Sequence, residues 1–198
     1  MRLRLMALLP AFMIIAPSSA RAQAEFGVLG GVTFGNISNK GVLPGNLSTR
    51  TGFAGGGYVG YRFGVFGVGA EAMYAQRGLK SDESIATADT KLDYVDIPAY
   101  IKVNIPVPGV RPYAYLGPQV SFEVGCASSD GAACSNPNRK KTDFAGLIGA
   151  GVRFGPDNIG VGVEARYVYG LTDLNLNTVS NAESYKNRTF MILVRIGK

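Results

Sequence analysis

Hydrophobic and polar residues alternate with a period of two along most of the chain after residue 22. The run TGFAGGGYVGYRF at 51–63, for example, places Phe53 and Tyr61 on one parity and Arg62 on the other. This alternation indicates β-strands whose two faces meet different environments, because a helix would repeat about every 3.6 residues. Eight such runs are predicted, at residues 25–35, 51–63, 65–77, 91–104, 110–123, 142–154, 159–170 and 187–197.

The connections between the predicted strands alternate in length. Long connections rich in Gly, Ser, Asn and Asp lie at 36–50, 78–90, 124–141 and 171–186, and tight turns lie at 64, 105–109 and 155–158. Long loops on one rim and short turns on the other are typical of outer-membrane barrels, and an even strand number lets the sheet close without an exposed edge. The pattern predicts an all-β fold, an eight-stranded antiparallel up-and-down transmembrane β-barrel.

The two parities of the strands differ in chemistry. One parity is apolar and carries aromatic residues near the strand ends, as expected for a lipid-facing surface with interfacial girdles. The other parity collects charged residues that we expect to pair in a lumen charge network, namely Glu71, Asp96, Lys102, Glu164, Arg166 and Arg195.

A soluble lipocalin-like barrel would show the same alternation with its faces reversed. Its exterior would be roughly 25–35% charged, whereas the polar parity here is mostly Gly, Ala, Tyr and Met, and the chain has no Trp. The membrane barrel is therefore favoured, and a soluble carrier of a hydrophobic ligand is the less favoured alternative.

The stretch KLDYVDIPAYIKVNI at 91–105 shows how charge fits a membrane strand. Asp96, Pro98 and Lys102 share the lumen parity, so the two charges are expected to find partners inside the barrel, such as Glu71 on the preceding strand. Pro98 has no N–H, and its lost ladder bond predicts a bulge or a widened pair at that position.

Residues 1–22 have the features of a cleaved signal peptide. Arg2 and Arg4 precede an apolar run at 5–16, and Ala20-Arg21-Ala22 forms an A-x-A cleavage site. We therefore predict a signal peptide over 1–22 and one barrel domain over 23–198, located in the bacterial outer membrane. Removing Arg2, Arg4 and Arg21 lowers the net charge from +6 to +3, which is too mild to indicate nucleic-acid binding.

Export gives the two cysteines an expected state. Cys126 and Cys134 flank a small polar stretch, and in an oxidising compartment they are expected to form a disulfide. Metal binding is the rival interpretation, but the chain has no histidine and only these two thiols. We therefore predict a disulfide and no metal or cofactor.

The composition also bears on catalysis. Because there is no histidine, the usual base of barrel lipases and proteases is missing, and the protein is not expected to be an enzyme. The lumen carboxylates Glu71, Asp96, Glu123 and Glu164 are expected to form structural ion pairs, since an eight-stranded barrel is just wide enough for side chains to fill. Lumen-parity glycines leave some room, so a narrow pore for small solutes remains an alternative.

Several segments resemble one known family. The segments that occur in the family's order are FGVLGGVTFGNIS at 26–38, TGFAGGGYVGYRF at 51–63, GAEAMYAQRGLK at 69–80, LDYVDIPAYIKV at 92–103, YLGPQVSF at 115–122 and KNRTFMILVRI at 186–196. They are similar to the PorT-like, or porin family, small outer-membrane β-barrel proteins of Gram-negative bacteria, of which one member serves protein secretion. The chain departs from the family at its end, where Arg195-Ile196-Gly197-Lys198 replaces a closing aromatic that the barrel-assembly machinery recognises.

These observations predict an integral outer-membrane protein with a structural, surface-interaction or assembly-partner role and a side-chain-filled lumen. The expected partners are outer-membrane lipid, the barrel-assembly machinery and an unidentified surface or periplasmic protein, and the chain is expected to be a monomer. The polar loops at 36–50 and 171–186 are suited to surface recognition. Asp173, Asn175 and Asn177 alternate like a weak calcium-ligand set, but no Gly or Glu follows at calcium-loop spacing, so a solvated loop is expected there.

Overall fold

The structure, a computed structural model, describes residues 22–39, 47–81, 90–128, 134, 140–156, 158–172 and 185–198. The predicted signal peptide lies almost entirely outside these residues, so the boundary at residue 22 stays a prediction. Within the described residues, no helix is long and apolar enough to cross a membrane.

Eight strands close into one barrel. They are β1 (Gln23–Asn39), β2 (Leu47–Phe63), β3 (Phe66–Ser81), β4 (Thr90–Asn104), β5 (Val110–Ser128), β6 (Thr142–Phe154), β7 (Gly160–Gly170) and β8 (Tyr185–Gly197). Each strand pairs antiparallel with the next, and β1 pairs with β8 to close the ring. The predicted eight-stranded antiparallel barrel is confirmed.

Several strands extend past the predicted ends. The ladder of β1 with β8 continues to Asn39, β3 runs to Ser81 and β5 runs to Ser128, through residues without apolar alternation. Beyond the lipid, a strand can keep its backbone pairing without an apolar face. The polar strand ends are therefore not predicted from the alternation of hydrophobic and polar residues.

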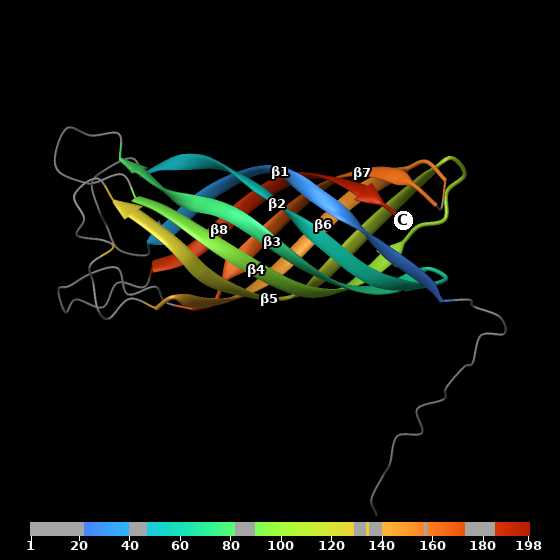
Figure 1. Ribbon diagram of the computed structural model, residues 1–198, viewed down its shortest axis with the longest axis horizontal. Coiled ribbons are helices and arrows are strands. Elements are labelled where there is room, and N and C mark those ends of the chain that lie inside the picture. The colour runs from blue at the N-terminus through green and yellow to red at the C-terminus, as the bar shows by residue number, and fades with distance from the viewer. Residues whose placement is uncertain are drawn as a thin grey trace, which may run out of the picture.

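The two ends of the barrel are unlike (Figure 1). At one end β2 turns into β3, β4 into β5 and β6 into β7, and the chain also enters β1 and leaves β8 there; we call it the turn end. Gly64 and Gly109 lie in two of these turns with φ of 63° and 82°, a backbone conformation that other residues rarely adopt. We call the opposite end, where the strands lead into residues 40–46, 82–89, 129–139 and 173–184, the loop end.

The barrel wall is apolar outside and polar inside. Val59, Phe66 and Ile148 point outward and are 62%, 63% and 59% exposed, whereas Asp96 and Arg166 are 0% and 1% exposed. A soluble protein rarely exposes so continuous an apolar surface, but lipid tails would cover it. The lipocalin-like alternative, which needs the reverse arrangement, is therefore wrong.

Of the two alternatives predicted at Pro98, a bulge or a widened pair, the bulge is wrong. Pro98 pairs with Gln119 of β5 in regular register. The pairs between β4 and β3 stop at Ala99 and resume at Asp96 without a change of register, so the missing N–H interrupts the ladder but does not add a residue. The register of β4 with β5 shifts instead between Asp93 and Tyr94, towards the loop end.

Candidate functional site

Four charged side chains meet in the middle of the lumen. Each of two arginines bridges both of two glutamates: Arg166 Nη2 lies 2.7 Å from Glu71 Oε2 and 2.9 Å from Glu164 Oε1. Arg195 Nη2 lies 2.9 Å from Glu71 Oε1, and its Nη1 lies 3.1 Å from Glu164 Oε2. All four are buried. We call this group the central quartet; it is neutral, and it ties β3 to β7 and β8.

Tyrosine hydroxyls complete the hydrogen bonding of the quartet. Tyr115 donates to Glu164 Oε1 (2.8 Å) and accepts from Arg166 Nε (2.9 Å). Tyr113 donates to the other Glu164 oxygen at 2.8 Å, and Tyr100 accepts from Arg195 at 2.9 Å. Three of the four ions also hydrogen-bond to a tyrosine, and the fourth, Glu71, accepts from both arginines, so the cost of burying four charges is offset within the group.

Glycines on one strand let these tyrosines reach the strand beyond it. Tyr113 and Tyr115 of β5 stand opposite Gly151 and Gly149 of β6, which in turn stand opposite Glu164 and Arg166 of β7. A Cβ atom at Gly149 would lie 2.3 Å from Tyr115 Cζ, and one at Gly151 would lie 2.7 Å from Tyr113 Cζ. The rings therefore lie across β6, in space that the Cβ atom of any residue other than glycine would fill.

The same arrangement recurs elsewhere in the wall. Tyr100 of β4 lies over Gly69 of β3, where a Cβ atom would come within 2.7 Å of the ring. Tyr58 of β2 crosses Gly27 of β1 and reaches Gly197 of β8, whose Cβ would lie 2.6 Å from the hydroxyl. At these positions the room that lumen glycines were expected to leave is filled by tyrosine.

Of the six residues predicted to form the lumen charge network, the structure brings four together in the quartet. Asp96 lies nearer the loop end and pairs with Arg77, which also stands over the Tyr94 ring. Lys102 lies nearer the turn end and pairs with Glu25.

The suggested pairing of this strand's charges with Glu71 is therefore wrong. Lys102 stands opposite Gly67, four residues along β3 from Glu71, which is about 13 Å at the usual rise per residue. Glu71 instead forms ion pairs with Arg166 and Arg195. The predicted network is divided into separate layers along the barrel axis.

A second polar layer lies toward the loop end. Asp96, Ser121 and Asp143 stand in one row across β4, β5 and β6, and all three are buried. Asp96 has Arg77 as its counter-ion. Among the described residues, no group of three or more His, Cys, Asp or Glu side chains has the arrangement of a metal site.

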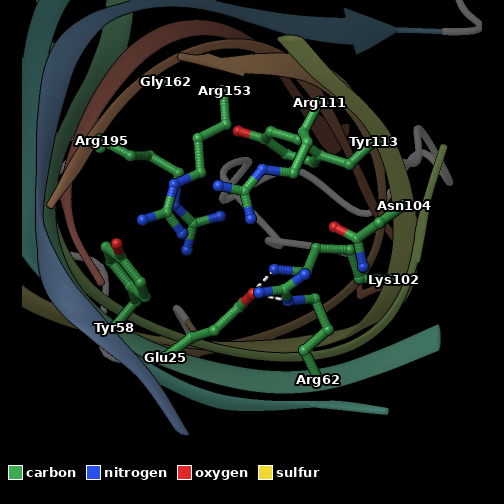
Figure 2. A pocket seen from close by; sticks show the side chains of 11 residues that line it. Glu25, Tyr58, Arg62, Lys102, Asn104, Arg111, Tyr113, Arg153, Gly162 and Arg195 are labelled. Atoms are coloured by element: carbon green, nitrogen blue, oxygen red, sulfur yellow. Dashed lines mark hydrogen bonds and ion pairs between the residues drawn. The ribbon is translucent and has the colours of Figure 1, made fainter. Parts of the chain in front are cut away.

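The turn end of the lumen holds a basic cavity, shown in Figure 2. Its charged lining residues are Glu25, Arg62, Lys102, Arg111, Arg153 and Arg195. Glu25 pairs with Lys102 and lies 3.3 Å from Arg62 Nε. The cavity has a volume of about 30 Å³, and its lining includes Arg195 of the central quartet and Tyr113, which hydrogen-bonds to Glu164.

Sequence reasoning missed Glu25 and the tyrosines. Glu25 shares parity with the buried Leu29 and Thr33, so the alternation of the first strand already assigned it to the lumen. The role of Tyr115 depends on the register of β5 with β6, which are joined by a long connection whose length does not define that register.

The disulfide joins Cys126 at the loop end of β5 to Cys134, with Cα atoms 5.8 Å apart. Of the proposed recognition loops, residues 40–46 of the first and 173–184 of the second, including Asp173, Asn175 and Asn177, lie outside the described residues, whereas 36–39 and 47–50 belong to β1 and β2.

Comparison with known proteins places the chain in a family. The family model described as outer membrane protein beta-barrel domain matches residues 17–175. Among solved structures, the chain is similar to Neisserial surface protein A (NspA), with 18% identity and a TM-score of 0.48 over 89% of this chain and 99% of that one.

It is also similar to the N-terminal β-barrel domain of Pseudomonas aeruginosa OprF, with 12% identity and a TM-score of 0.34 over 85% of this chain and 98% of that one. No curated protein sequence matches the chain. The family match covers most of the chain and agrees with the closed eight-stranded barrel, so the chain belongs to the outer membrane protein beta-barrel domain family and lies in the bacterial outer membrane.

Proposed function

We propose that the protein is a closed barrel of the PorT-like kind, with a structural, surface-interaction or assembly-partner role and neither a pore nor an enzymatic activity. The observation that carries this proposal is the central quartet. It spans the lumen from β3 to β7 and β8 with buried, mutually paired charges, and tyrosines fill the space beside it. A network of this kind supports a plugged interior, because opening it would unpair buried ions.

Planar-bilayer recording of the full chain tests the closed lumen. The wild type is expected to give a conductance indistinguishable from that of lipid alone. The variant Glu71→Ala/Arg195→Ala removes one glutamate and one arginine from facing walls of the lumen, and it is expected to conduct. A steady single-channel conductance from the wild type would contradict the closed lumen and favour the narrow-pore alternative.

A surface or assembly role predicts protein partners. Crosslinking in intact outer membranes, followed by purification of the tagged chain, is expected to recover a protein besides the barrel-assembly machinery. Recovery of lipid and assembly factors alone would count against a partner and leave a purely structural role. We propose that the barrel itself is a monomer, and cross-linked species of twice its mass would argue against this.

A further inference from the structure

An apolar groove lies on the outer wall of the barrel, over β6. Its lining includes Leu116 and Pro118 of β5, Gly146 and Ile148 of β6, and Tyr167 and Tyr169 of β7. Gly146 stands between Pro118 and Tyr169 in the ladder, and a Cβ atom built on it has no neighbour within 4 Å. The groove has a volume of about 450 Å³. One water in the liquid occupies about 30 Å³, so the groove has room for a length of hydrocarbon chain.

An arginine lies beside this groove on the lipid-facing side of β8. Arg188 is opposite Tyr169 in the ladder, and its guanidinium carbon lies 5.4 Å from the centre of that ring. Gly146 and Arg188 flank Tyr169 on its two neighbouring strands. Strands are spaced about 4.8 Å apart, so the backbone of Arg188 is about 10 Å from the floor of the groove. A single lipid molecule can span this distance.

The position of Arg188 fits an anion at the surface of the membrane. On the same face of β8 the residues from Phe190 to Ile196 are apolar and exposed, and Arg188 follows them toward the loop end. A lipid-facing arginine is unfavourable in the hydrocarbon layer but tolerated near the interface, where lipid phosphates lie. Among the residues that the structure describes, no carboxylate forms an ion pair with Arg188, and its buried Nε has no hydrogen-bond partner.

We propose that the groove and Arg188 together bind lipid A, the phosphorylated glycolipid of the outer leaflet. One acyl chain lies in the groove, and a phosphate group lies on the guanidinium, which matches phosphate oxygens in a two-pronged geometry. Lipid A joins phosphate-bearing sugars to several acyl chains, so one molecule supplies both the anion and the chain.

The choice of lipid A over a phospholipid follows from the orientation of the barrel. Long loops face outside the cell in outer-membrane barrels, so the loop end meets the outer leaflet, whereas the phospholipids of the inner leaflet meet the turn end. Tyr169 is the last residue but one of β7, and Arg188 is the fourth residue of β8, so both lie near the loop end. Binding on the outer wall does not depend on whether the lumen is closed, so this site is independent of the proposed function.

Native mass spectrometry of the full chain in uncharged maltoside detergent, titrated with purified lipid A, tests the site. The wild type is expected to bind lipid A more tightly than dephosphorylated lipid A. Arg188→Gln is expected to weaken the affinity for lipid A about tenfold or more, because it removes charge-assisted hydrogen bonds to the phosphate. With dephosphorylated lipid A the same variant is expected to match the wild type.

A second variant tests the groove itself. Gly146→Phe fills the groove and is expected to weaken the binding of both forms of lipid A. Heat-modifiable migration shows which variants are folded, and Arg188→Gln tests the site alone if Gly146→Phe does not fold.

Two matched controls lie on other strands. Lys91→Gln removes a different loop-end cation, on β4, whose Nζ lies 3.9 Å from Asp93 Oδ2. Gly55→Phe adds the same ring at another outward-facing glycine, on β2, where a Cβ atom would meet only the Leu29 carbonyl oxygen, at 3.8 Å. Both variants are expected to bind lipid A as the wild type does.

Three results would overturn the proposal. Phosphatidylglycerol bound as tightly as lipid A would contradict the assignment to lipid A. Undiminished affinity in Arg188→Gln would remove the arginine from the site. Equal losses in Arg188→Gln and Lys91→Gln would show a general effect of surface charge in place of a specific contact.

Discussion

The crossing of β6 by Tyr115 makes a sharp prediction about Gly149. In Gly149→Ala the new Cβ would lie 2.3 Å from Tyr115 Cζ and 2.5 Å from its hydroxyl, closer than atoms approach. The ring has to move away, and it then loses the hydrogen bond it donates to Glu164 and the one it accepts from Arg166.

The size of the effect follows from these two bonds. Each involves a charged group and contributes about 1.5–3 kcal/mol net. Because the displaced ring keeps part of its packing and Ala favours an extended chain over Gly by up to about 1 kcal/mol, the expected loss is about 3 kcal/mol of unfolding free energy. Urea titration of the barrel in detergent micelles, followed by circular dichroism and by heat-modifiable migration, measures it.

Gly146→Ala is the matched control on the same strand, because a Cβ atom there has no neighbour within 4 Å. It is expected to be neutral or slightly stabilising. A second check combines Gly149→Ala with Tyr115→Ala, which removes the ring and with it the clash, so the cost of the glycine substitution should largely disappear in that background. Equal stabilities of Gly149→Ala and Gly146→Ala would refute the placement of the Tyr115 ring across β6 at Gly149.

Further predictions concern the same network and the disulfide. Glu164→Gln leaves the quartet with one carboxylate for two arginines and is expected to cost about 3 kcal/mol or more in urea titrations; a loss under 1 kcal/mol would contradict the pairing. Tyr115→Phe removes two bonds to charged groups and Tyr113→Phe one, so the first should be about twice as destabilising as the second. Cys126→Ser/Cys134→Ser opens a crosslink between residues eight apart and should lower the unfolding free energy by up to about 2.5 kcal/mol, as reductant should do for the wild type.

Most of the fold was predictable from the alternation of hydrophobic and polar residues. The outer face has to be apolar to contact lipid, and the pleat of a strand directs every second residue inward. Asp96, Glu164 and Arg195 were assigned to the lumen on that ground alone, and their burial agrees. Alternation says nothing about height along the barrel axis, which depends on register and strand tilt. For this reason the lumen location of Lys102 was predicted, but its pairing with Glu25 of β1 was not.

The glycines show a second limit of pattern reasoning. Read singly, Gly69, Gly149 and Gly151 imply space, since each removes a side chain from the lumen. In the structure, however, a tyrosine ring from the neighbouring strand packs over each of these glycines. Which tyrosine lies over which glycine depends on the register of two neighbouring strands. Where a long connection joins the strands, the sequence does not define that register. Only tight turns, such as the one joining Phe63 to Phe66, make the register readable in advance.

The central quartet has a consequence for how the barrel is made. Glu71 is synthesised early, but its partners Arg166 and Arg195 follow 95 and 124 residues later, on the last two strands. Until β8 arrives, an assembling sheet holds an unmatched carboxylate on the surface that becomes its interior, and water must remain there to solvate it. Neutralisation of that charge and closure of the seam between β1 and β8 therefore occur together. A chain without β8 would keep two glutamates of the quartet against one arginine, so the last strand completes the charge balance of the lumen as well as the barrel wall.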